Sequence, residues 1–526
     1  MTVNTLAIVG TGIMGMGIAQ IAAQAGIQVL LFDAKSGAAE QGRASLQGTL
    51  EKLAAKGKFT ADELQATLNN LTVIQELSQI KTAEIVVEAI IENLDIKKQL
   101  FAQLEEVVAA DTILATNTSS LSVTAIAADC ENPERVVGFH FFNPVPLMKI
   151  VEIIPGISTQ HSVVDALTSL AKRMGHLGVV AKDTPGFIVN HAGRAYGTES
   201  LKILGEGIAN FEQIDRILRD GAGFRMGPFE LMDLTGVDVS HPVMESIYEQ
   251  YYQEARYRPH PLTRQMLTGK KLGRKVGEGF YHYENGQKVS VDSAKNQSSQ
   301  TLASDASVTS VWIGADLRED KKQLVDYLNT CGITIDNNDK PSLDSLVLLA
   351  IYGDDTTNAA IRYQVDPKQA VAIDMLTELT KHRTLMPSLV TQEHFVAQAY
   401  ALFASSTVSK GLDDSKVNAQ NMGSATLIDE STGFVAQRVV AMVINLGCDI
   451  AMQGIATPED IDNAVKLGLG YPYGPISWGD HLGVSRILLI LERIYALTGD
   501  PRYRPSPWLQ RRAKLAVSLF TQQTTY

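Results

Sequence analysis

Residues 5–35 read TLAIVGTGIMGMGIAQIAAQAGIQVLLFDAK, and this stretch decides the fold of the first domain. Its apolar run Leu6–Val9 is typical of a buried parallel strand, and Val29–Phe32 is a second run of the same kind. Between them, Ile13–Gln24 has the periodicity of a helix, and Gly26 ends it. The order strand, helix, strand predicts a doubly wound α/β domain.

Three glycines, Gly10, Gly12 and Gly15, join the first strand to the helix with G-x-G-x-x-G spacing. The first permits a tight turn, the second lets the backbone approach a pyrophosphate, and the third lets the helix pack on the strand. The helix begins at Ile13 and Met14, where free backbone N–H groups would face the phosphates. We therefore predict that these five residues bind a dinucleotide. A glycine-rich turn without a ligand is the alternative.

Asp33 closes the second strand, 18 residues after Gly15. At this place a carboxylate accepts hydrogen bonds from the ribose hydroxyls and repels the 2′-phosphate of NADP. The sequence therefore predicts NAD as the cofactor. Lys35 would soften this preference, although a solvated lysine after a strand is the more common interpretation.

The composition of the whole chain limits its class. It has 526 residues, 45% of them hydrophobic, which fits a globular protein of about three to four domains. The formal charge of −12 argues against a nucleic-acid partner. Three widely spaced cysteines exclude a disulfide framework and a C-x-x-C metal site, so we expect a cytoplasmic protein without a metal. The N-terminus lacks the features of a signal peptide, and no apolar stretch approaches about 18 residues, so no membrane association is expected.

Further strands are predicted at Ala83–Ile90 and Thr112–Thr116. In a doubly wound sheet, the carboxyl ends of the strands line the ligand crevice. Polar residues near predicted strand ends should therefore lie on the cofactor side, and these are Glu92, Asn117, Ser119 and His140.

The segment VVGFHFFNPVPLMKIVEIIPG, residues 136–156, places His140 and Glu152 in an apolar background. A hydride-transfer dehydrogenase needs a base for the hydroxyl proton, and histidine has a suitable pKa. A carboxylate at its other ring nitrogen fixes the tautomer and stabilises the imidazolium. We predict this pair as the catalytic base and its orienting group, with Ser119 and Asn143 as polar donors. The alternatives are a buried core histidine, a surface glutamate on a strand edge, and a helix cap at Ser119.

The chain resembles the 3-hydroxyacyl-CoA dehydrogenase family over roughly residues 3–285. The matching stretches appear in the family's order and are VGTGIMGMGIA, VVEAIIENLDIKKQLF, TNTSSLSV, HFFNPVPLMKIVEII, KDTPGFIVN and GRKVGEGFYHY. The resemblance implies His140 as the catalytic base, Glu152 as its carboxylate, and Asn190 with Ser119 as groups that contact the substrate. It also implies that Asn143 lies near the nicotinamide. Further NAD contacts that it implies are Asp33, Glu92, Lys97 and Lys275. It also implies that Thr49 and Lys56 face the CoA phosphates, although a lysine-rich helix is usually only a solvated face.

The helical part that follows occurs twice. Gly186-Phe187 matches Gly433-Phe434, and Gly227-Pro228 matches Gly474-Pro475, with the same separation of 247 residues (433 − 186). This constant separation indicates an internal duplication. Position 190 corresponds to Gln437 instead of asparagine, so a second active site is doubtful.

Between the copies, residues 288–306 are rich in Ser, Gln and Asp and predict a linker. The following segments alternate strand and helix without a GxGxxG motif, which indicates a degenerate Rossmann-like segment that binds no NAD. We therefore predict a Rossmann-type α/β domain at 1–182, an all-α domain at 183–286, a linker and degenerate α/β segment at 287–428, and a second all-α copy at 429–526. The two all-α copies are expected to pair within one chain, and a homo-oligomer stays open.

The expected activity is NAD-dependent oxidation of a (3S)-3-hydroxyacyl-CoA to the 3-oxoacyl-CoA. The two-copy layout resembles the bacterial branch that acts on 3-hydroxyadipyl-CoA in phenylacetate breakdown, with 3-hydroxybutyryl-CoA as the simpler substrate. Arg194 or Arg225 would bind a distal carboxylate, unless both are structural. One alternative is a hydroxyacid or sugar-acid dehydrogenase that does not use CoA. Another is a catalytically silent NAD-binding structural or sensor protein of the same fold.

Overall fold

The computed structural model describes residues 3–289, 308–404 and 425–522. The chain forms two compact units that are each built from separate stretches of sequence. Unit 1 contains residues 1–192 together with 450–470, and unit 2 contains residues 193–449 together with 471–526. Each unit therefore combines parts of both sequence copies.

Unit 1 is built on an eight-stranded sheet with the order β3-β2-β1-β4-β5-β6-β7-β8. The first six strands in this order are parallel, whereas β7 runs antiparallel to β6 and parallel to β8. Apolar side chains that are almost fully buried on these strands form the core. The strands are β1 Thr5–Val9, β2 Gln28–Phe32, β3 Leu71–Val73, β4 Ile85–Glu88, β5 Ile113–Thr116, β6 Val136–Phe141, β7 Ile150–Pro155 and β8 Leu177–Val180.

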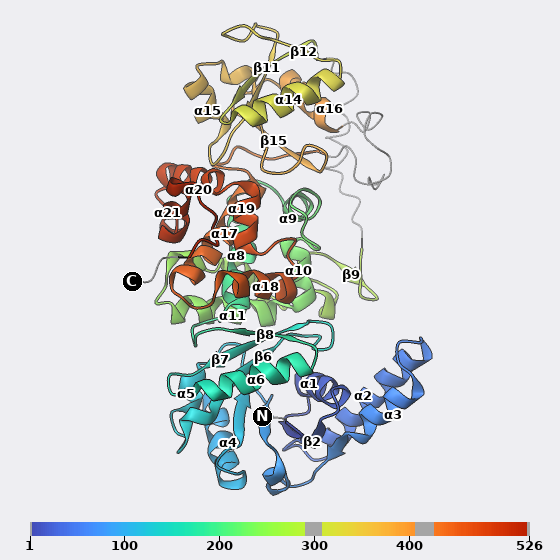
Figure 1. Cartoon of the computed structure of the whole chain (residues 1–526). Helices are drawn as coiled ribbons and strands as arrows, with labels where there is room; N and C mark the ends of the chain where they lie inside the picture. Colours follow the sequence, from blue (N-terminus) through green and yellow to red (C-terminus); the bar gives the residue numbers. More distant parts are fainter. Residues whose placement is uncertain (1–2, 290–307, 405–424, 523–526) are drawn as a thin grey trace. The chain divides into compact units, whose positions relative to one another are not determined.

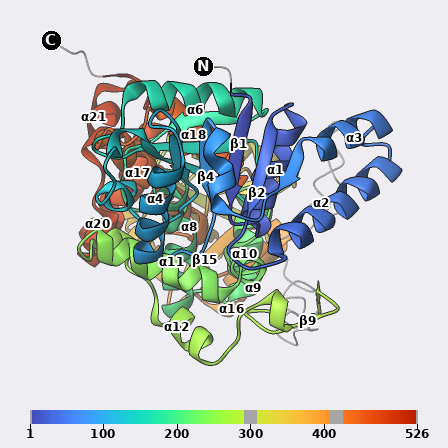
Figure 2. The ribbon, with the colours of Figure 1, turned by 90° about the horizontal axis from the view of Figure 1, so that it is seen from below.

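Helices connect these strands, so the predicted Rossmann-type domain is confirmed. Helix α1 begins and ends where the sequence predicts, and α2 and α3 form a hairpin that projects from the sheet (Figures 1 and 2). A capping box at Thr60 and Glu63 fixes the start of α3. The helices are α1 Ile13–Gln24, α2 Ala38–Ala55, α3 Ala61–Asn69, α4 Leu94–Val107, α5 Val123–Ala127, α6 His161–Arg173 and α7 Val189–Ala192.

One helix of unit 1 comes from the far end of the chain. Helix α18, Pro458–Leu469, packs against α7, β7 and β8. The backbone N–H of Lys182 donates to the carbonyl of Ile455 over 3.0 Å, which ties the start of this segment to the end of β8.

Unit 2 contains the predicted helical copies. The first comprises α8 Arg194–Gly205, α9 Phe211–Arg216, the π-helical turn η3 Ile217–Gly221, α10 Pro228–Thr235, α11 Val237–Gln250, η4 Ala255–Tyr257, α12 Pro261–Thr268 and η5 Arg274–Val276. The second comprises α17 Val435–Met452, α19 Pro475–Leu482, α20 Val484–Thr498, η8 Pro501–Tyr503 and α21 Pro507–Leu515. Helix α17 is long and apolar enough to cross a membrane, but 94% of it is buried inside the protein.

The two copies contact each other within unit 2 through reciprocal arginine contacts. Arg256 of the first copy donates to the carbonyl of Arg504, and Arg502 of the second copy donates to the carbonyl of Arg258 over 3.0 Å. The separation here is 246 residues (502 − 256 = 504 − 258), one less than in the earlier part of the copies. Each residue on one side thus has its repeat partner on the other, as in an interface related by two-fold symmetry. This arrangement agrees with the predicted pairing of the copies within one chain.

A buried ionic cluster reinforces the same pairing. Arg438 on α17 donates to Glu199 on α8 over 2.8 Å and to Glu206 over 2.6 Å. Tyr503 donates to the same Glu199 over 2.6 Å. Because the Glu199 side chain is fully buried, its charge depends on these partners.

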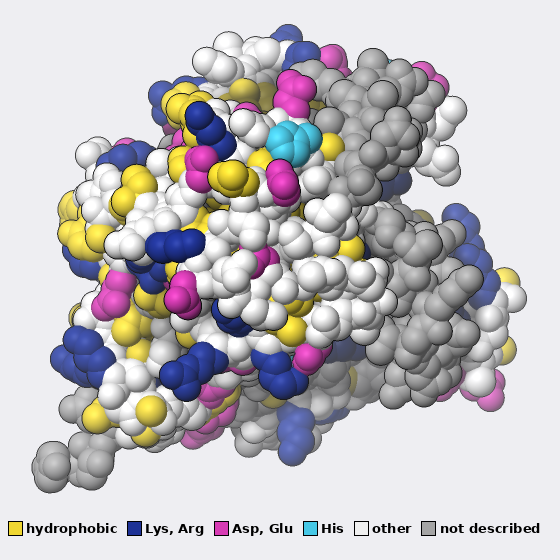
Figure 3. Space-filling view, turned by 90° about the horizontal axis from the view of Figure 1, so that it is seen from above, with side chains coloured by type: hydrophobic (Ala, Val, Ile, Leu, Met, Phe, Trp, Pro, Cys, Tyr) yellow, Lys and Arg dark blue, Asp and Glu magenta, His cyan; other side chains and the backbone are white. Residues whose placement is uncertain are grey.

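Unit 2 also contains a six-stranded sheet with the order β12-β11-β13-β14-β15-β16. Strand β15 is antiparallel to β14 and parallel to β16, as β7 is to β6 and β8. On the face of this region shown in Figure 3, acidic and basic side chains are mixed. The elements are β11 Ser310–Ala315, α14 Arg318–Thr330, β12 Thr334–Ile335, β13 Leu346–Ala350, α15 Thr356–Tyr363, β14 Ala370–Ile373, β15 Arg383–Pro387, α16 Glu393–Ala404 and β16 Ala425–Leu427.

The predicted linker begins later than expected. Residues Gln287–Lys288 form β10, which pairs with β9 Tyr283–Glu284, and Lys288 forms an ion pair with Glu230. These contacts attach Lys288 to the first helical copy. The remainder of the predicted linker, 290–306, lies outside the described residues.

Candidate active site

The glycine-rich turn between β1 and α1 has the geometry that a dinucleotide requires. Gly10 has a φ of 100°, and a Cβ atom there would lie 2.6 Å from the carbonyl oxygen of Ala89. A Cβ at Gly15 would lie 1.8 Å from the carbonyl oxygen of Gly10, so the helix approaches the turn as only glycine allows. A Cβ at Gly12 would meet no atom within 4 Å, which leaves open space at the start of α1.

The start of α1 is free to receive a phosphate group. Gly12 is its N-cap and provides no side chain to cap it. Ile13 is 78% exposed, although it is a large apolar residue. Free N–H groups beside open space and an exposed apolar side chain fit the pyrophosphate and neighbouring parts of a dinucleotide.

Asp33 is oriented by the same turn. Its Oδ2 accepts hydrogen bonds from the backbone N–H and hydroxyl of Thr11, at 2.8 and 2.9 Å, and Oδ1 accepts from the N–H of Lys35. Burial raises the pKa of Asp33, but these hydrogen bonds outweigh it and hold the pKa below the ordinary value. The carboxylate is therefore charged and in place to accept ribose hydroxyls.

Glu92 organises the loop after β5. One of its oxygens accepts from the Thr118 hydroxyl at 2.7 Å and from the backbone N–H groups of Ser119 and Ser120 at 2.9 and 3.1 Å. Burial raises its pKa, but the charge of Lys97 and these hydrogen bonds hold it below the ordinary range.

Lys97 stabilises this loop through ion pairs with two carboxylates. Its ammonium lies 2.5 Å from Glu88 and 3.4 Å from Glu92, and its side chain is only 1% exposed. In this structure it acts by holding the two carboxylates, so its direct contact with NAD stays a prediction. Glu88, which was not predicted from the sequence, is fully buried and also accepts a hydrogen bond from Thr116 at 2.7 Å. An acidic residue at the end of the apolar run AEIVVEAI was the available signal.

His140 and Glu152 lie opposite each other on the antiparallel strands β6 and β7. His140 Nδ1 and Glu152 Oε2 are 2.7 Å apart, and the side chains are 6% and 0% exposed. The other carboxylate oxygen accepts the backbone N–H groups of Ile188 and Val189, both at 2.9 Å. A surface glutamate on a strand edge, the alternative for Glu152, is therefore wrong.

This geometry defines which ring nitrogen of His140 can react. Because ionised Glu152 only accepts hydrogen bonds, Nδ1 carries the proton in the neutral ring. Nε2 then has a free lone pair and can accept a proton from a substrate. The rings of Phe142 and Phe187 lie 4.5 and 5.8 Å from that of His140, so apolar side chains surround the dyad.

The polar residues predicted around the dyad occupy the neighbouring elements. Asn190 lies on α7, next to the two N–H groups that bind Glu152. Asn117 follows β5 and accepts the N–H of Phe141 at 2.8 Å, which joins this strand end to β6. Ser119 lies in the loop held by Glu92, whereas Ser122 caps α5, so the helix-cap alternative for Ser119 is wrong. Asn143 is exposed just after β6.

A second residue that sequence reasoning missed fixes this loop. Asp183 accepts hydrogen bonds from the Ser122 hydroxyl at 2.7 Å and from the N–H groups of Val123 and Thr124. It thus joins the start of α5 to the segment that leads into α7.

The predicted CoA and outer cofactor residues lie on the surface. Thr49 and Lys56 are exposed on and just after α2, in the projecting hairpin. Lys275 belongs to unit 2, where it forms an ion pair of 2.5 Å with Asp238. Their contacts with CoA and NAD stay predictions.

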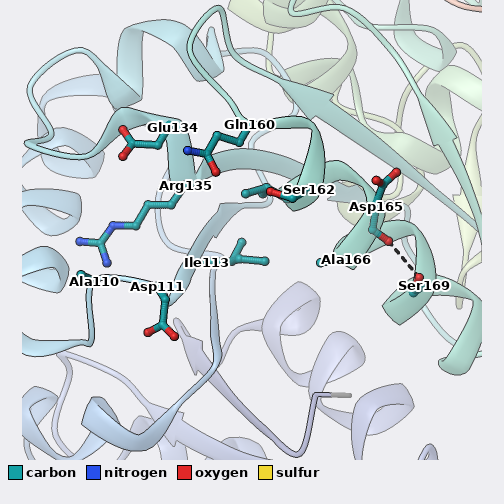
Figure 4. Close-up of a pocket in the computed structure, with 11 residues that line it drawn as sticks. Ala110, Asp111, Ile113, Glu134, Arg135, Gln160, Ser162, Asp165, Ala166 and Ser169 are labelled. Carbon is teal, nitrogen blue, oxygen red and sulfur yellow. Dashed lines mark hydrogen bonds between the residues drawn. The ribbon is translucent and has the colours of Figure 1, made fainter. Parts of the chain in front are cut away.

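A hollow of about 510 Å³ lies elsewhere in unit 1, lined by the starts of β5 and α6 (Figure 4). Ile113, the first residue of β5, lines this hollow. The hollow therefore lies at the amino ends of the parallel strands, whereas His140 lies near the carboxyl end of β6. Arg135 there is already bound to Glu105, and three carboxylates, Asp111, Glu134 and Asp165, surround the opening. These charges do not suit a phosphate-bearing ligand. Among the described residues, no group of three or more His, Cys, Asp or Glu is arranged to bind a metal.

Comparison with known proteins decides the family. A model of the NAD-binding domain of 3-hydroxyacyl-CoA dehydrogenase matches residues 5–184. The model of the C-terminal domain of the same family matches twice, at residues 186–283 and 433–518. The chain belongs to the 3-hydroxyacyl-CoA dehydrogenase family. It is therefore an NAD-dependent oxidoreductase, and the predicted cofactor is confirmed.

Relatives of this dehydrogenase resemble it over different lengths. The 3-hydroxyadipyl-CoA dehydrogenase of Escherichia coli (strain K12) is 36% identical over 98% of both chains. The crystal structure of 3-hydroxybutyryl-CoA dehydrogenase from Escherichia coli K12 has a TM-score of 0.81 at 35% identity and covers 98% of this chain and 99% of that one. The probable 3-hydroxybutyryl-CoA dehydrogenase of Bacillus subtilis is 40% identical over 54% of this chain and 99% of its own. The second half of the dehydrogenase thus has counterparts in some relatives and not in others.

Proposed function

We propose that this dehydrogenase oxidises (3S)-3-hydroxyacyl-CoA to 3-oxoacyl-CoA, with His140 as the base. The single observation that carries the proposal is the buried pair of His140 and Glu152 in the same unit as the glycine-rich turn. NAD, when bound, accepts the hydride from the C3 carbon of the substrate.

His140 Nε2 takes the hydroxyl proton in this reaction, and Glu152 stabilises the imidazolium that results. Glu152 is held by two backbone N–H groups, so it does not need to move when the charge on His140 changes. Acid–base catalysis by a positioned group contributes roughly 10²–10⁴-fold to such a rate.

Ser119 and Asn190 orient the substrate oxygen in our proposal. The backbone of Ser119 is fixed by Glu92, and Asn190 follows the N–H groups that bind Glu152, so both donors lie next to backbone that a carboxylate holds in place. Glu92, Asp33, Asn117, Asn143 and Lys275 would hold NAD, whereas Thr49 and Lys56 would bind the CoA phosphates.

For the acyl group we propose a short or dicarboxylyl chain. The names of the two Escherichia coli proteins, 3-hydroxyadipyl-CoA dehydrogenase and 3-hydroxybutyryl-CoA dehydrogenase, support both substrates. Arg194 or Arg225 would bind a distal carboxylate. Arg225 is exposed, whereas burial lowers the pKa of Arg194 to about 10, at the start of α8. A place in phenylacetate or fatty-acid catabolism in the cytoplasm fits these substrates.

We further propose that the chain has only one active site. The strand registers support this conclusion, because they identify the residues at the catalytic positions of the second sheet. Glu152 pairs with Val179, and Thr384 pairs with Thr426, which lies 247 residues after Val179. Thr384 therefore occupies the position of Glu152. His140 lies opposite Glu152, and Asp374 donates its N–H to the carbonyl of Thr384, so Asp374 occupies the position of His140.

The remaining two positions follow in the same way. Thr116 pairs with Gly138, two residues before His140, and Leu349 pairs with Ala372, two residues before Asp374. Thr116 therefore corresponds to Leu349, and Ser119, three residues after Thr116, corresponds to Tyr352. Asn190 corresponds to Gln437 through the repeat separation. In the second copy, the positions of Ser119, His140, Glu152 and Asn190 are thus occupied by Tyr352, Asp374, Thr384 and Gln437.

The second cluster is closed by its own hydrogen bonds. Gln437 donates to Asp374 at 3.0 Å and to the carbonyl of Ile351 at 2.8 Å, and it accepts the N–H of Gly353 at 2.9 Å. All four residues at the catalytic positions are at most 2% exposed. We infer that this hydrogen-bonded glutamine takes the place of a substrate, and none of the four residues is a histidine that could act as base.

A test of both proposals is NAD reduction with 3-hydroxybutyryl-CoA and 3-hydroxyadipyl-CoA, combined with titration of the protein with NADH. We expect turnover and one NADH bound per chain. A silent NAD-binding protein would bind NADH and turn over neither substrate. Two NADH molecules per chain would contradict the proposal of a single site.

A further inference from the structure

The segment 450–470 comes from the second sequence copy, yet it belongs to the unit that contains the catalytic dyad. Two hydrogen bonds from Lys182 attach its beginning, from the backbone N–H to Ile455 and from the ammonium to the carbonyl of Gln453 at 3.3 Å. Helix α18 then packs against α7, β7 and β8. The second copy therefore contributes a helix to the active-site unit.

The elements that α18 contacts are those that hold Glu152. Strand β7 carries Glu152 itself, and the N–H groups of Ile188 and Val189 at the start of α7 bind its carboxylate. Asn190 is the next residue of α7. Any shift of α7 would therefore change the orientation of Glu152 and of a predicted substrate contact together.

Gly468 of α18 lies directly against this region. A Cβ atom there would lie 2.9 Å from Cγ2 of Val189, 3.3 Å from its Cγ1 and 3.7 Å from Cγ2 of Ile150. Valine is branched at Cβ and has little rotational freedom, so it does not yield easily. The absence of a side chain at Gly468 is thus what lets the helix lie against Val189 and Ile150.

The same exchange occurs in the opposite direction within unit 2. The N–H of Asp429 donates to the carbonyl of Ile208 at 2.9 Å, and both residues lie 247 positions from Lys182 and Ile455. The counterpart of Gly468 is Gly221, where a Cβ would lie 3.3 Å from the carbonyl oxygen of His382, the residue before β15 of the second sheet. Each helical copy thus gives this segment to the sheet of the other copy. Only one of the two receiving sheets carries the dyad.

We propose that α18 is a positioning element of the active site and that Gly468 is its critical residue. Close packing at Gly468 sets the position of α7, and α7 orients Glu152 and Asn190. On this basis, the second copy is needed for turnover although its own cluster is closed. This inference rests on the proposed function of His140 and Glu152.

The test uses the full chain with Gly468→Ala, assayed with NADH and acetoacetyl-CoA. The added methyl group displaces Val189, and we expect kcat to fall about 10-fold to 100-fold, because small misplacements of catalytic groups have effects of this size. The affinity for NADH should stay within about twofold of the wild type, because the glycine-rich turn is untouched. The matched control is Lys466→Ala, an exposed position on the same helix, which should leave kcat unchanged.

A second variant keeps the test specific. Val189→Ala removes the methyl groups that the new Cβ meets, so the double variant Gly468→Ala/Val189→Ala should recover kcat at least about threefold over Gly468→Ala alone. Wild-type kcat in Gly468→Ala would overturn the inference and leave the proposed function intact. A parallel loss of NADH affinity without rescue would also overturn it, since it would indicate general damage to the fold. No turnover by the wild type would overturn the proposed function, and the inference with it.

Discussion

Replacing Glu152 by glutamine removes the charge beside His140 while it keeps the size and shape of the side chain. The carboxylate accepts three hydrogen bonds, one from His140 Nδ1 and two from the N–H groups of Ile188 and Val189. An amide has only one oxygen, and the two backbone donors require it on their side. The NH₂ group must then face Nδ1 of His140.

This exchange reverses the tautomer of the imidazole. A donor opposite Nδ1 makes that nitrogen an acceptor, so the proton moves to Nε2, the nitrogen that should receive the proton of the substrate. In a catalytic triad, the equivalent change of aspartate to asparagine lowers kcat by about 10⁴-fold. We expect a fall of about 10³–10⁴-fold here, which is about 4–5.5 kcal/mol of activation free energy at about 1.36 kcal/mol for each factor of ten.

The assay is the initial rate of NAD reduction with 3-hydroxybutyryl-CoA at saturating substrate. Glu105→Gln is a suitable control, because the Glu105 side chain in unit 1 is also only 7% exposed. Its ionic partner is Arg135, which precedes β6, whereas His140 lies near the other end of that strand. The control should keep its kcat. A folded Glu152→Gln enzyme with a kcat within about threefold of the wild type would refute the role assigned to this carboxylate.

Three further predictions concern the cofactor, the pairing of the copies and the closed cluster. Asp33→Asn should weaken NAD binding about tenfold and improve the relative binding of NADP, because one charge-assisted hydrogen bond is worth about 1.5 kcal/mol. Fluorescence titration with both cofactors checks this, and an unchanged preference for NAD over NADP would contradict it. Arg438→Met leaves the buried Glu199 with only the longer ion pair to Arg502, at 3.6 Å, and should lower the free energy of unfolding by about 3 kcal/mol, measured by urea denaturation. A loss below about 1 kcal/mol would be inconsistent with a coupling role. Burial raises the pKa of Asp374 from 3.8 to about 6, so the folded protein keeps this proton between about pH 4 and 6 while the unfolded chain releases it. Its contribution to stability therefore falls as the pH rises through this window, and the advantage of Asp374→Asn over the wild type should grow toward about 3 kcal/mol above pH 6; a difference that does not depend on pH would exclude this carboxyl as its source.

The first domain could be predicted from the sequence because its signals are local. The glycine spacing, the apolar runs and Asp33 lie within 31 consecutive residues, and the structure reproduces the strand, the helix and the turn that they indicate. The pair of His140 and Glu152 could also be predicted, since the two residues lie 12 positions apart in the sequence, on adjacent strands.

Other features depend on contacts between distant parts of the chain. Glu88 lies within the predicted strand Ala83–Ile90, and only the fold brings Lys97 and Thr116 to it. The repeat separation revealed two helical copies, but periodicity does not tell which sheet each copy covers, so the place of α18 in unit 1 could not be inferred. The sequence showed Gln437 instead of asparagine, but its hydrogen bond to Asp374, 63 residues earlier, depends on how the chain folds.

The most direct test of the account is the rate at which His140→Gln oxidises NADH with acetoacetyl-CoA, beside His161→Gln, an exposed histidine of α6, as control. We expect His140→Gln to bind NADH normally and to lose at least about 10²-fold in kcat, the lower limit for acid–base catalysis, whereas the control is unaffected. A His140→Gln enzyme that retains its kcat would show that another group, or the second cluster, donates the proton to the substrate oxygen.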